Sequence, residues 1–265
     1  MRGEVRQIVA FGGGGFSMER GNPLLDDYVL SLARERSTRE RPSRERPRVC
    51  FLPTASGDAD HYIVRFYRAF SPELCEPSHV SLFRRECAVG DVREHLLTRD
   101  LIYVGGGSVI SLLGAWRAHG LDLILREAWE RGVVLCGLSA GSLCWFAEAV
   151  TAFHGPPQAV TGLGLLPWSN CVHFDAEPAR CAGYRRLLAE GMRPGYGTED
   201  GAALHFEGER LARVVASRMG ARAHRMRWTG KRVSRRPLAS TYLGGAGAGA
   251  ASVSAAAGRL SVVAA

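Results

Sequence analysis

Short apolar runs alternate with longer amphipathic stretches along most of the chain. Four of these runs have the length of buried strands, and each is followed directly by glycine or proline, which interrupts a strand. They are Gln7–Phe11, Val49–Leu52, Leu101–Val104 and Val133–Cys136. A further strand is predicted over residues 79–83. Helices are predicted from Leu24 onward and over about 60–70, 92–97 and 108–131, the last with a break near Gly120.

This alternation of strands and helices predicts a particular layering. Parallel neighbours need crossover connections, and the helices then cover both faces of the sheet. We therefore expect an α/β fold, a three-layer sandwich with a mostly parallel sheet. The stretch from Arg34 to Arg48 is almost wholly Arg, Glu, Ser and Pro, which indicates an exposed connector. Residues 244–265 are rich in Gly and Ala, so we expect a single domain over 1–243 and a flexible tail after it.

The net charge of +8 is unevenly distributed. From Arg210 onward there are 11 basic residues and no acidic one, so the rest of the chain has 23 basic and 26 acidic residues. A nucleic-acid interface would need cations gathered on a folded face with stacking aromatics, and no RNA or DNA module is recognisable. We expect the basic segment to be solvated or loosely ordered, and we do not expect nucleic acid as a partner.

Composition indicates a cytoplasmic protein. No run of about 18 apolar residues is present, and residues 1–11 lack the apolar core of a signal peptide. The seven cysteines are odd in number, and several lie in apolar runs without a C-x-x-C pair. This pattern is typical of reduced, buried thiols. It predicts neither a disulfide framework nor a zinc site, and we expect no membrane partner.

The pentapeptide Gly137-Leu138-Ser139-Ala140-Gly141 fits the pattern G-x-S-x-G. In this motif a nucleophilic serine sits on a sharp turn from strand to helix, where flanking side chains would clash. The context fits, because a predicted strand precedes it and a helical pattern over 142–149 follows. Backbone N–H groups at the start of that helix would face a developing oxyanion. The motif therefore predicts Ser139 as a nucleophile.

A nucleophilic serine needs a histidine base and a carboxylate that orients the base. We favour His173, which ends a short apolar segment, because catalytic groups gather at strand ends in open α/β sheets. The other candidate histidines are His61, His79, His154 and His205. Asp200 or Glu199 supplies the carboxylate. The order Ser, His, Asp differs from that of α/β-hydrolases, in which the acid comes between the other two.

Four blocks in this order resemble one family of peptidases. The blocks are Val104-Gly105-Gly106-Gly107-Ser108, Gly137-Leu138-Ser139-Ala140-Gly141-Ser142, Val172-His173-Phe174-Asp175 and Glu199-Asp200-Gly201. Together with the glycine-rich stretch after Phe11, they resemble the peptidase E (aspartyl dipeptidase) branch of the serine peptidases that also include cyanophycinases. The similarity runs from about Gln7 to Leu243. It implies a three-layer sandwich related to class I glutamine amidotransferase domains, which carry a cysteine at the elbow.

The resemblance also implies the catalytic groups. Ser139 is implied as nucleophile, His173 as general base and Asp200 as the acid, with Glu199 as the alternative. Backbone N–H groups near Gly107 and of Ala140 are implied as the oxyanion hole, in agreement with the physics of the elbow. No metal and no organic cofactor is implied.

The expected substrate is a small peptide. Members of the peptidase E branch cleave dipeptides with an N-terminal aspartate, and Arg180 matches the arginine that is suited to bind that carboxylate. Ser108 is a departure, because many relatives have asparagine after the three glycines. Two alternatives stay open. One is hydrolysis of cyanophycin-like peptides, and the other is a catalytically silent binding domain whose basic segment engages an anionic partner.

Overall fold

The structure is a computed structural model that describes residues 5–40, 46–84 and 90–245. Its strands are β1 (Gln7–Phe11), β2 (Arg48–Leu52), β3 (Glu76–His79), β4 (Leu101–Val104), β5 (Val134–Leu138), β6 (Phe146–Thr151), β7 (Gln158–Thr161), β8 (Leu166–Cys171), β9 (Gly195–Thr198), β10 (Ala202–Glu207), β11 (Arg210–Ala216), β12 (Ala223–Trp228), β13 (Val233–Pro237) and β14 (Thr241–Tyr242). Its helices are α1 (Gly15–Met18), α2 (Leu24–Glu40), α3 (Asp60–Ala69), α4 (Val92–Leu97), α5 (Val109–His119), α6 (Leu121–Glu130), α7 (Ala140–Leu143) and α8 (Pro178–Ala189), with a 3-10 turn, η1 (Thr54–Ser56). The tail expected over 244–265 lies outside these residues apart from Gly244 and Gly245.

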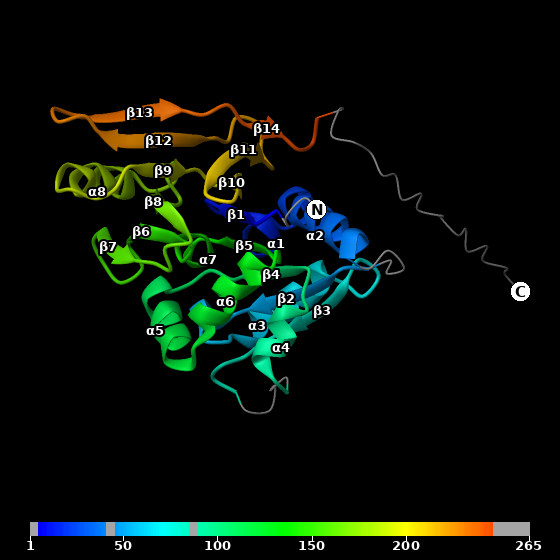
Figure 1. The fold of residues 1–265 in the computed structure, drawn as a ribbon. Coiled ribbons are helices and arrows are strands. Elements are labelled where there is room, and N and C mark those ends of the chain that lie inside the picture. Colours follow the sequence, from blue (N-terminus) through cyan, green and yellow to red (C-terminus); the bar gives the residue numbers. More distant parts are fainter. Residues whose placement is uncertain (1–4, 41–45, 85–89, 246–265) are drawn as a thin grey trace, which may run out of the picture.

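The first sheet has eight strands in the order β14-β11-β10-β1-β5-β4-β2-β3 (Figure 1). From β1 to β3 in this order, neighbouring strands run parallel, as the alternating pattern predicts. β10 is antiparallel to both β1 and β11. β1, β4 and β5 are buried along their whole length. Their continuous apolar sequence follows from this burial, because a strand covered on both faces has no solvent side.

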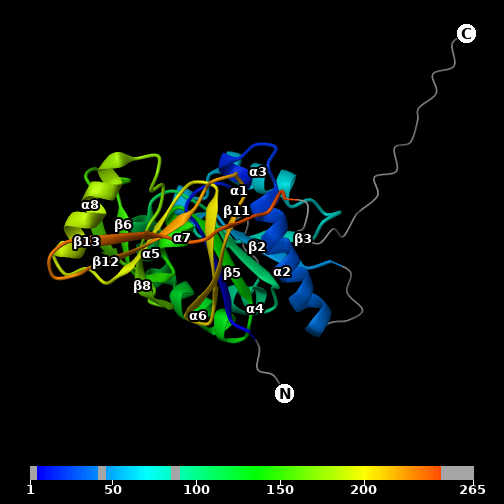
Figure 2. The same cartoon turned by 90° about the horizontal axis from the view of Figure 1, so that it is seen from above.

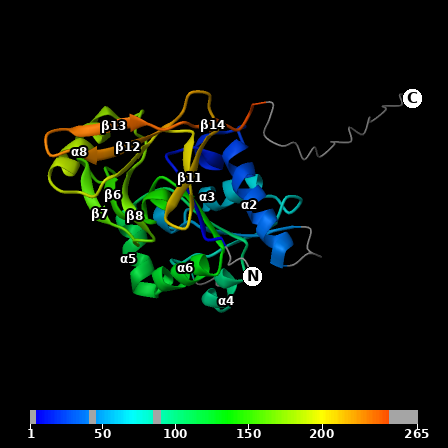
Figure 3. The ribbon, with the colours of Figure 1, turned by 45° about the horizontal axis from the view of Figure 1, so that its top comes forward.

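Helices cover both faces of this sheet. On one face, strand residues such as Val9 and Phe51 pack against α2 and α3. On the other face, their neighbours Ile8 and Ile102 pack against α5 and α6. Figure 3 shows α5, α6 and α4 following one another along one side of the molecule. The predicted α/β sandwich is confirmed, and so is the helix break, because Gly120 separates α5 from α6 with φ 70°.

A second sheet was not predicted. Its order is β13-β12-β9-β8-β6-β7, and its residues pack with α8 through Tyr184 and Leu188. Figure 2 shows α8 and the β12–β13 hairpin at the end of the molecule away from α2. The predicted helix over 142–149 is wrong, because α7 ends at Leu143 and the chain continues as β6, which pairs with β7 and β8.

The basic segment is folded, so the expectation of a loosely ordered stretch is wrong for its described part. Residues 210–242 form β11 to β14. Several of its cations pair with acids from outside the segment, as Arg218 does with Glu19 at 2.6 Å and Arg235 with Glu199 at 3.9 Å. Because these acids lie elsewhere in the chain, local composition is a poor guide to the order of the segment.

The predicted connector over 34–48 begins as helix, because α2 continues to Glu40. Arg and Glu are good helix formers. Arg36 is also buried, and its guanidinium donates to the backbone oxygen of Arg131 at 2.8 Å, which anchors this part of the helix.

The fifth predicted strand is displaced toward the N-terminus. β3 covers Glu76–His79 and pairs with β2, whereas residues 81–83 are not in a strand. The backbone N–H groups of Leu82 and Phe83 donate to the Asp58 carboxylate, at 2.7 and 2.8 Å, and have no neighbouring strand as acceptor.

The cysteines of the described residues are free thiols. Five of these six are buried, and Cys87 lies outside the described residues. Burial raises the pKa of the Cys50 thiol to about 12, so it stays protonated at neutral pH. Across the described residues, no helix is both long enough and apolar enough to cross a membrane.

Candidate active site

Ser139 occupies a strained turn between β5 and α7. Its φ of 52° and ψ of −115° are unusual for a residue with a side chain, and such backbone strain gathers at functional sites. The flanking glycines permit the turn. A Cβ at Gly137 would overlap the Gly141 carbonyl oxygen, and a Cβ at Gly141 would overlap that of Val104. The G-x-S-x-G pattern therefore reflects the close packing of α7 on the ends of β4 and β5.

His173 and Asp200 meet Ser139 although they come from the second sheet. His173 follows β8, and Asp200 lies in the turn after β9. His173 Nε2 is 3.0 Å from Ser139 Oγ, and its Nδ1 is 2.6 Å from Asp200 Oδ1. The chain thus brings together side chains 34 and 27 positions apart. Hydrogen bonding to Asp200 places the ring proton on Nδ1, which leaves Nε2 free to accept from Ser139.

The surroundings of Asp200 favour its ionised form. Burial opposes ionisation, but the hydrogen bond and charge of His173 outweigh it and hold the pKa of the Asp200 carboxyl below its usual value. Asp175 fixes the backbone here, because its carboxylate accepts the Asp200 N–H at 2.9 Å. Glu199, the alternative acid, accepts from the Arg222 N–H and lies 2.7 Å from His224 Nε2, away from His173.

The glycine run after β1 lies directly against the His173–Asp200 pair. The Gly12 carbonyl accepts the His173 N–H at 3.2 Å, and the Gly13 carbonyl accepts the Gly201 N–H at 2.9 Å. A Cβ at Gly13 would overlap Asp200 Oδ1 and lie 2.9 Å from His173 Nδ1. The sequence showed this run but did not indicate what it contacts. Its role in the site follows only from the fold.

The loop Gly105–Gly107 passes beside Ser139 and presents backbone N–H groups. Gly106 N–H donates to the Tyr62 hydroxyl at 3.0 Å, which ties this loop to α3. The N–H groups of Gly107 and Ala140 donate no hydrogen bond to any described residue. They are the two groups that the sequence suggested as an oxyanion hole. Ala140 follows Ser139 in the chain, and Gly107 lines the same cavity as Ser139.

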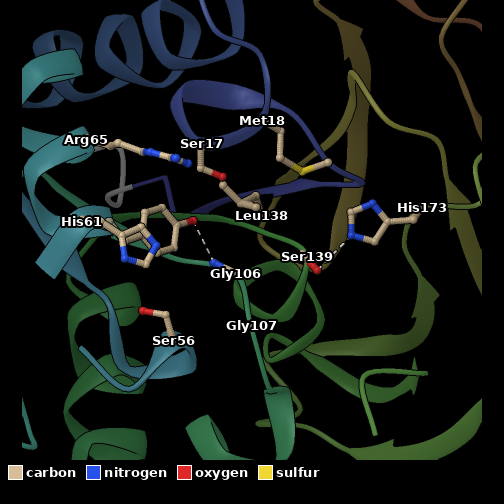
Figure 4. A pocket seen from close by; sticks show the side chains of 11 residues that line it. Ser17, Met18, Ser56, His61, Arg65, Gly106, Gly107, Leu138, Ser139 and His173 are labelled. Carbon is tan, nitrogen blue, oxygen red and sulfur yellow. Dashed lines mark hydrogen bonds between the residues drawn. The ribbon is translucent and has the colours of Figure 1, made fainter. Parts of the chain in front are cut away.

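A cavity of about 370 Å³ opens beside Ser139 and His173. Figure 4 shows the Gly106–Gly107 backbone between Ser139 on one side and His61 and Arg65 on the other. His61 and Arg65 come from α3, and Ser17 and Met18 from α1. The sequence offered His61 as a candidate histidine, and α1 lies in the glycine-rich stretch that takes part in the resemblance. It gave no indication that Arg65 lines the cavity, beyond the general rule that ligands bind past the carboxyl ends of parallel strands.

Other predicted residues do not line this cavity. The Arg180 guanidinium, near the start of α8, pairs with the Glu177 carboxylate, and its charge contributes to the lowered pKa of the Asp200 carboxyl. Of the remaining candidate histidines, His154 is 2.9 Å from the Ser108 hydroxyl and His205 is 2.6 Å from the Tyr28 hydroxyl. Within the described part of the chain, no cluster of three or more His, Cys, Asp or Glu side chains is arranged to hold a metal ion.

A serine on such a turn, in contact with a histidine that in turn contacts a carboxylate, is the arrangement of a serine hydrolase. Comparison with known proteins specifies the class. The sequence profile of Peptidase family S51 matches residues 8–214, and the chain belongs to this family. It is therefore a serine peptidase of the peptidase E and cyanophycinase type, as the sequence blocks suggested.

Two curated relatives illustrate the similarity. The chain is 46% identical to the uncharacterized peptidase YgaJ of Bacillus subtilis (strain 168) over 241 residues, 91% of this chain and 100% of that protein. It is 29% identical to Peptidase E of Streptomyces coelicolor over 174 residues, 62% of this chain and 69% of the relative.

Two solved structures share the fold. A crystal structure of a peptidase from an acI-B1 Actinobacterium aligns with a TM-score of 0.67 at 18% identity, covering 89% of this chain and 95% of that one. A putative Peptidase E from Listeria monocytogenes EGD-e aligns with a TM-score of 0.51 at 15% identity, covering 89% and 100%. At these identities the likeness concerns the fold alone.

Proposed function

We propose that the protein is a dipeptidase that hydrolyses peptides with an N-terminal aspartate through Ser139, His173 and Asp200. The observation that carries this proposal is the continuous chain of contacts from the Ser139 hydroxyl through the His173 imidazole to the Asp200 carboxylate. Ser139 and His173 line a cavity of about 370 Å³, a volume suited to a small ligand.

In the first half of the reaction, Ser139 Oγ attacks the carbonyl carbon of the scissile bond while His173 Nε2 takes the hydroxyl proton. The carbonyl oxygen gains the negative charge, and the N–H groups of Gly107 and Ala140 donate to it. The imidazolium then gives its proton to the leaving amine as the C–N bond breaks. This leaves the N-terminal residue as an ester on Ser139.

In the second half, water replaces the amine. His173 takes a proton from the water, the resulting hydroxide attacks the ester carbonyl, and the proton returns to Ser139 Oγ as the acid product leaves. Asp200 stays ionised throughout, holds the Nδ1–H tautomer and stabilises the imidazolium in both halves. Its lowered pKa supports this role, because a protonated carboxyl would do neither.

The preference for aspartate rests on the relatives. Several are named Peptidase E, and that branch acts on dipeptides with an N-terminal aspartate. The charge of the cavity supports the same preference, since the Arg65 guanidinium lines it and no carboxylate does so among the described residues. The arginine that the resemblance implies, Arg180, is engaged by Glu177.

The test is hydrolysis of Xaa-Leu dipeptides by the purified protein. We expect Asp-Leu to be cleaved faster than Asn-Leu or Ala-Leu, and Ser139→Ala to lower kcat by about 10⁴-fold or more. A peptide joined through the aspartate side-chain carboxyl tests the cyanophycin-like alternative. Failure to cleave any of these peptides, by folded protein, would contradict the proposal and favour a silent binding domain.

A further inference from the structure

The cavity beside Ser139 has an unbalanced charge. Three of the side chains that line it are permanently cationic or become cationic when protonated, namely Arg65, His61 and His173. Among the described residues that line it there is no carboxylate. His173 is already hydrogen-bonded to Asp200. The other two of these side chains, His61 and Arg65, both come from α3. A negatively charged group is the ligand that this environment favours.

Arg65 is the permanent cation of the three, and its guanidinium has no ion-pair or hydrogen-bond partner among the described residues. Other arginines near the site are neutralised. Arg180 pairs with Glu177, and Arg218 pairs with Glu19. Figure 4 shows the Arg65 guanidinium reaching toward Ser17 at the wall opposite His173. A guanidinium that faces a cavity without a partner is poised to receive a planar anion in two parallel hydrogen bonds.

The helix that carries Arg65 is fixed relative to Ser139. Tyr62 and Phe66, on either side of Arg65 in α3, are buried in the core. The Tyr62 hydroxyl also accepts the Gly106 N–H at 3.0 Å, from the loop that passes Ser139. The fold therefore sets the distance between Arg65 and the nucleophile, whereas the arginine side chain itself remains exposed to an incoming ligand.

We propose that Arg65 is the specificity residue of this peptidase and binds a carboxylate of the substrate. This inference rests on the proposed function. A dipeptide with an N-terminal aspartate offers two carboxylates, the aspartate side chain and the C-terminus, and both lie within a few bonds of the scissile carbonyl. The bound carboxylate occupies the wall of the cavity formed by α3 and α1, while the scissile carbonyl lies at Ser139.

The test measures binding in a background that cannot turn over. Ser139→Ala protein, alone and combined with Arg65→Ala, is titrated with Asp-Leu, Asn-Leu and Asp-Leu amide by calorimetry. We expect Arg65→Ala to weaken Asp-Leu binding by about 10- to 100-fold, the loss typical of a charge-assisted pair. Arg65→Lys should restore part of the affinity, because it returns the charge without the planar fork.

Arg68→Ala is the matched control. Arg68 lies one turn further along the same helix and does not line the cavity beside Ser139, so its removal subtracts the same charge without removing the contact. We expect it to leave Asp-Leu affinity within about twofold. Arg180→Ala, measured alongside, tests the arginine that the resemblance implies.

The two carboxylates give different patterns. If Arg65→Ala weakens the binding of Asp-Leu but not of Asn-Leu, Arg65 binds the aspartate side chain. If it weakens the binding of both but not of Asp-Leu amide, Arg65 binds the C-terminal carboxylate. Equal effects of Arg65→Ala and Arg68→Ala, no effect of Arg65→Ala, or no binding of any peptide would overturn the inference. Failure of the proposed function looks different: Asp-Leu then binds through Arg65 but is not cleaved by the protein with Ser139.

Discussion

Replacing Gly13 by alanine should disable the site without unfolding the protein. An added Cβ would overlap Asp200 Oδ1 and come within 2.9 Å of Asp200 Cγ and His173 Nδ1, where ordinary contacts are 3.4 Å or more. Since the φ of Gly13 is not in the left-handed region, the backbone accepts alanine. The overlap must then be relieved by movement of the Asp200 and His173 side chains. To relieve this overlap the carboxylate must retreat by about 1 Å or more. That lengthens the 2.6 Å contact with His173 beyond a good hydrogen bond.

The expected cost is large because the histidine loses its orienting partner. We predict a fall in kcat of about 10²- to 10⁴-fold on Asp-Leu, with KM changed by less than about threefold. Gly114→Ala is the control, since Gly114 lies in α5 with open space around the position of a Cβ. It should raise the free energy of unfolding by about 0.5–1 kcal/mol and leave kcat alone. A folded Gly13→Ala protein with kcat close to that of the wild type would refute the reasoning.

Further outcomes follow from the acids and histidines. Asp200→Asn should lower kcat by about 10³- to 10⁴-fold, whereas Glu199→Gln, whose side chain contacts Arg222 and His224, should retain kcat within about tenfold. Equal losses in steady-state assays would contradict the assignment. Burial raises the pKa of Asp26 to about 7 from 3.8, so the wild type loses stability as pH rises between these values. In urea unfolding, the free energy of unfolding of Asp26→Asn should rise relative to that of the wild type by roughly 2–3 kcal/mol between about pH 5 and 8. A difference between the two proteins that does not change with pH would count against a buried, neutral Asp26. Burial, with a smaller effect of the Arg213 charge, lowers the pKa of His205 from 6.5 to about 4. Its effect on stability therefore has the opposite pH dependence, and the wild type loses up to about 3 kcal/mol of its free energy of unfolding as pH falls from 6.5 to 4. The stability gap between the wild type and His205→Gln should shrink over that range, and a gap that grows on acidification would show the histidine to be charged in the fold.

The parallel part of the first sheet could be predicted because its signal is local. β1, β2, β4 and β5 coincide with short apolar runs that glycine or proline interrupts, whereas β11 and β14 lie in the basic segment and were not predicted. The second sheet has no such signal. β9 reads Gly-Tyr-Gly-Thr and β13 reads Val-Ser-Arg-Arg-Pro, and each is a strand only because a neighbouring strand pairs with it. Tertiary pairing overrides weak local preference in such segments.

The site divides in the same way. Ser139 could be predicted because its strained turn demands glycines at fixed positions, and the order of the blocks implied His173 and Asp200. The choice between Asp200 and Glu199 needed the direction of two neighbouring side chains, which a sequence does not specify. Arg65 could not be found, because a lone arginine on an amphipathic helix is most often a solvated residue. Its significance depends on where α3 lies relative to β5, a property of the assembled fold.

The central claim is that the Ser139 hydroxyl is activated by His173. The most direct measurement is covalent labelling with a fluorophosphonate, followed by intact mass and peptide mapping of the wild type, Ser139→Ala and His173→Ala. We expect one adduct on the peptide that contains Ser139, none in the serine variant and far slower labelling in the histidine variant. A label on another residue, or labelling at an undiminished rate without His173, would contradict it.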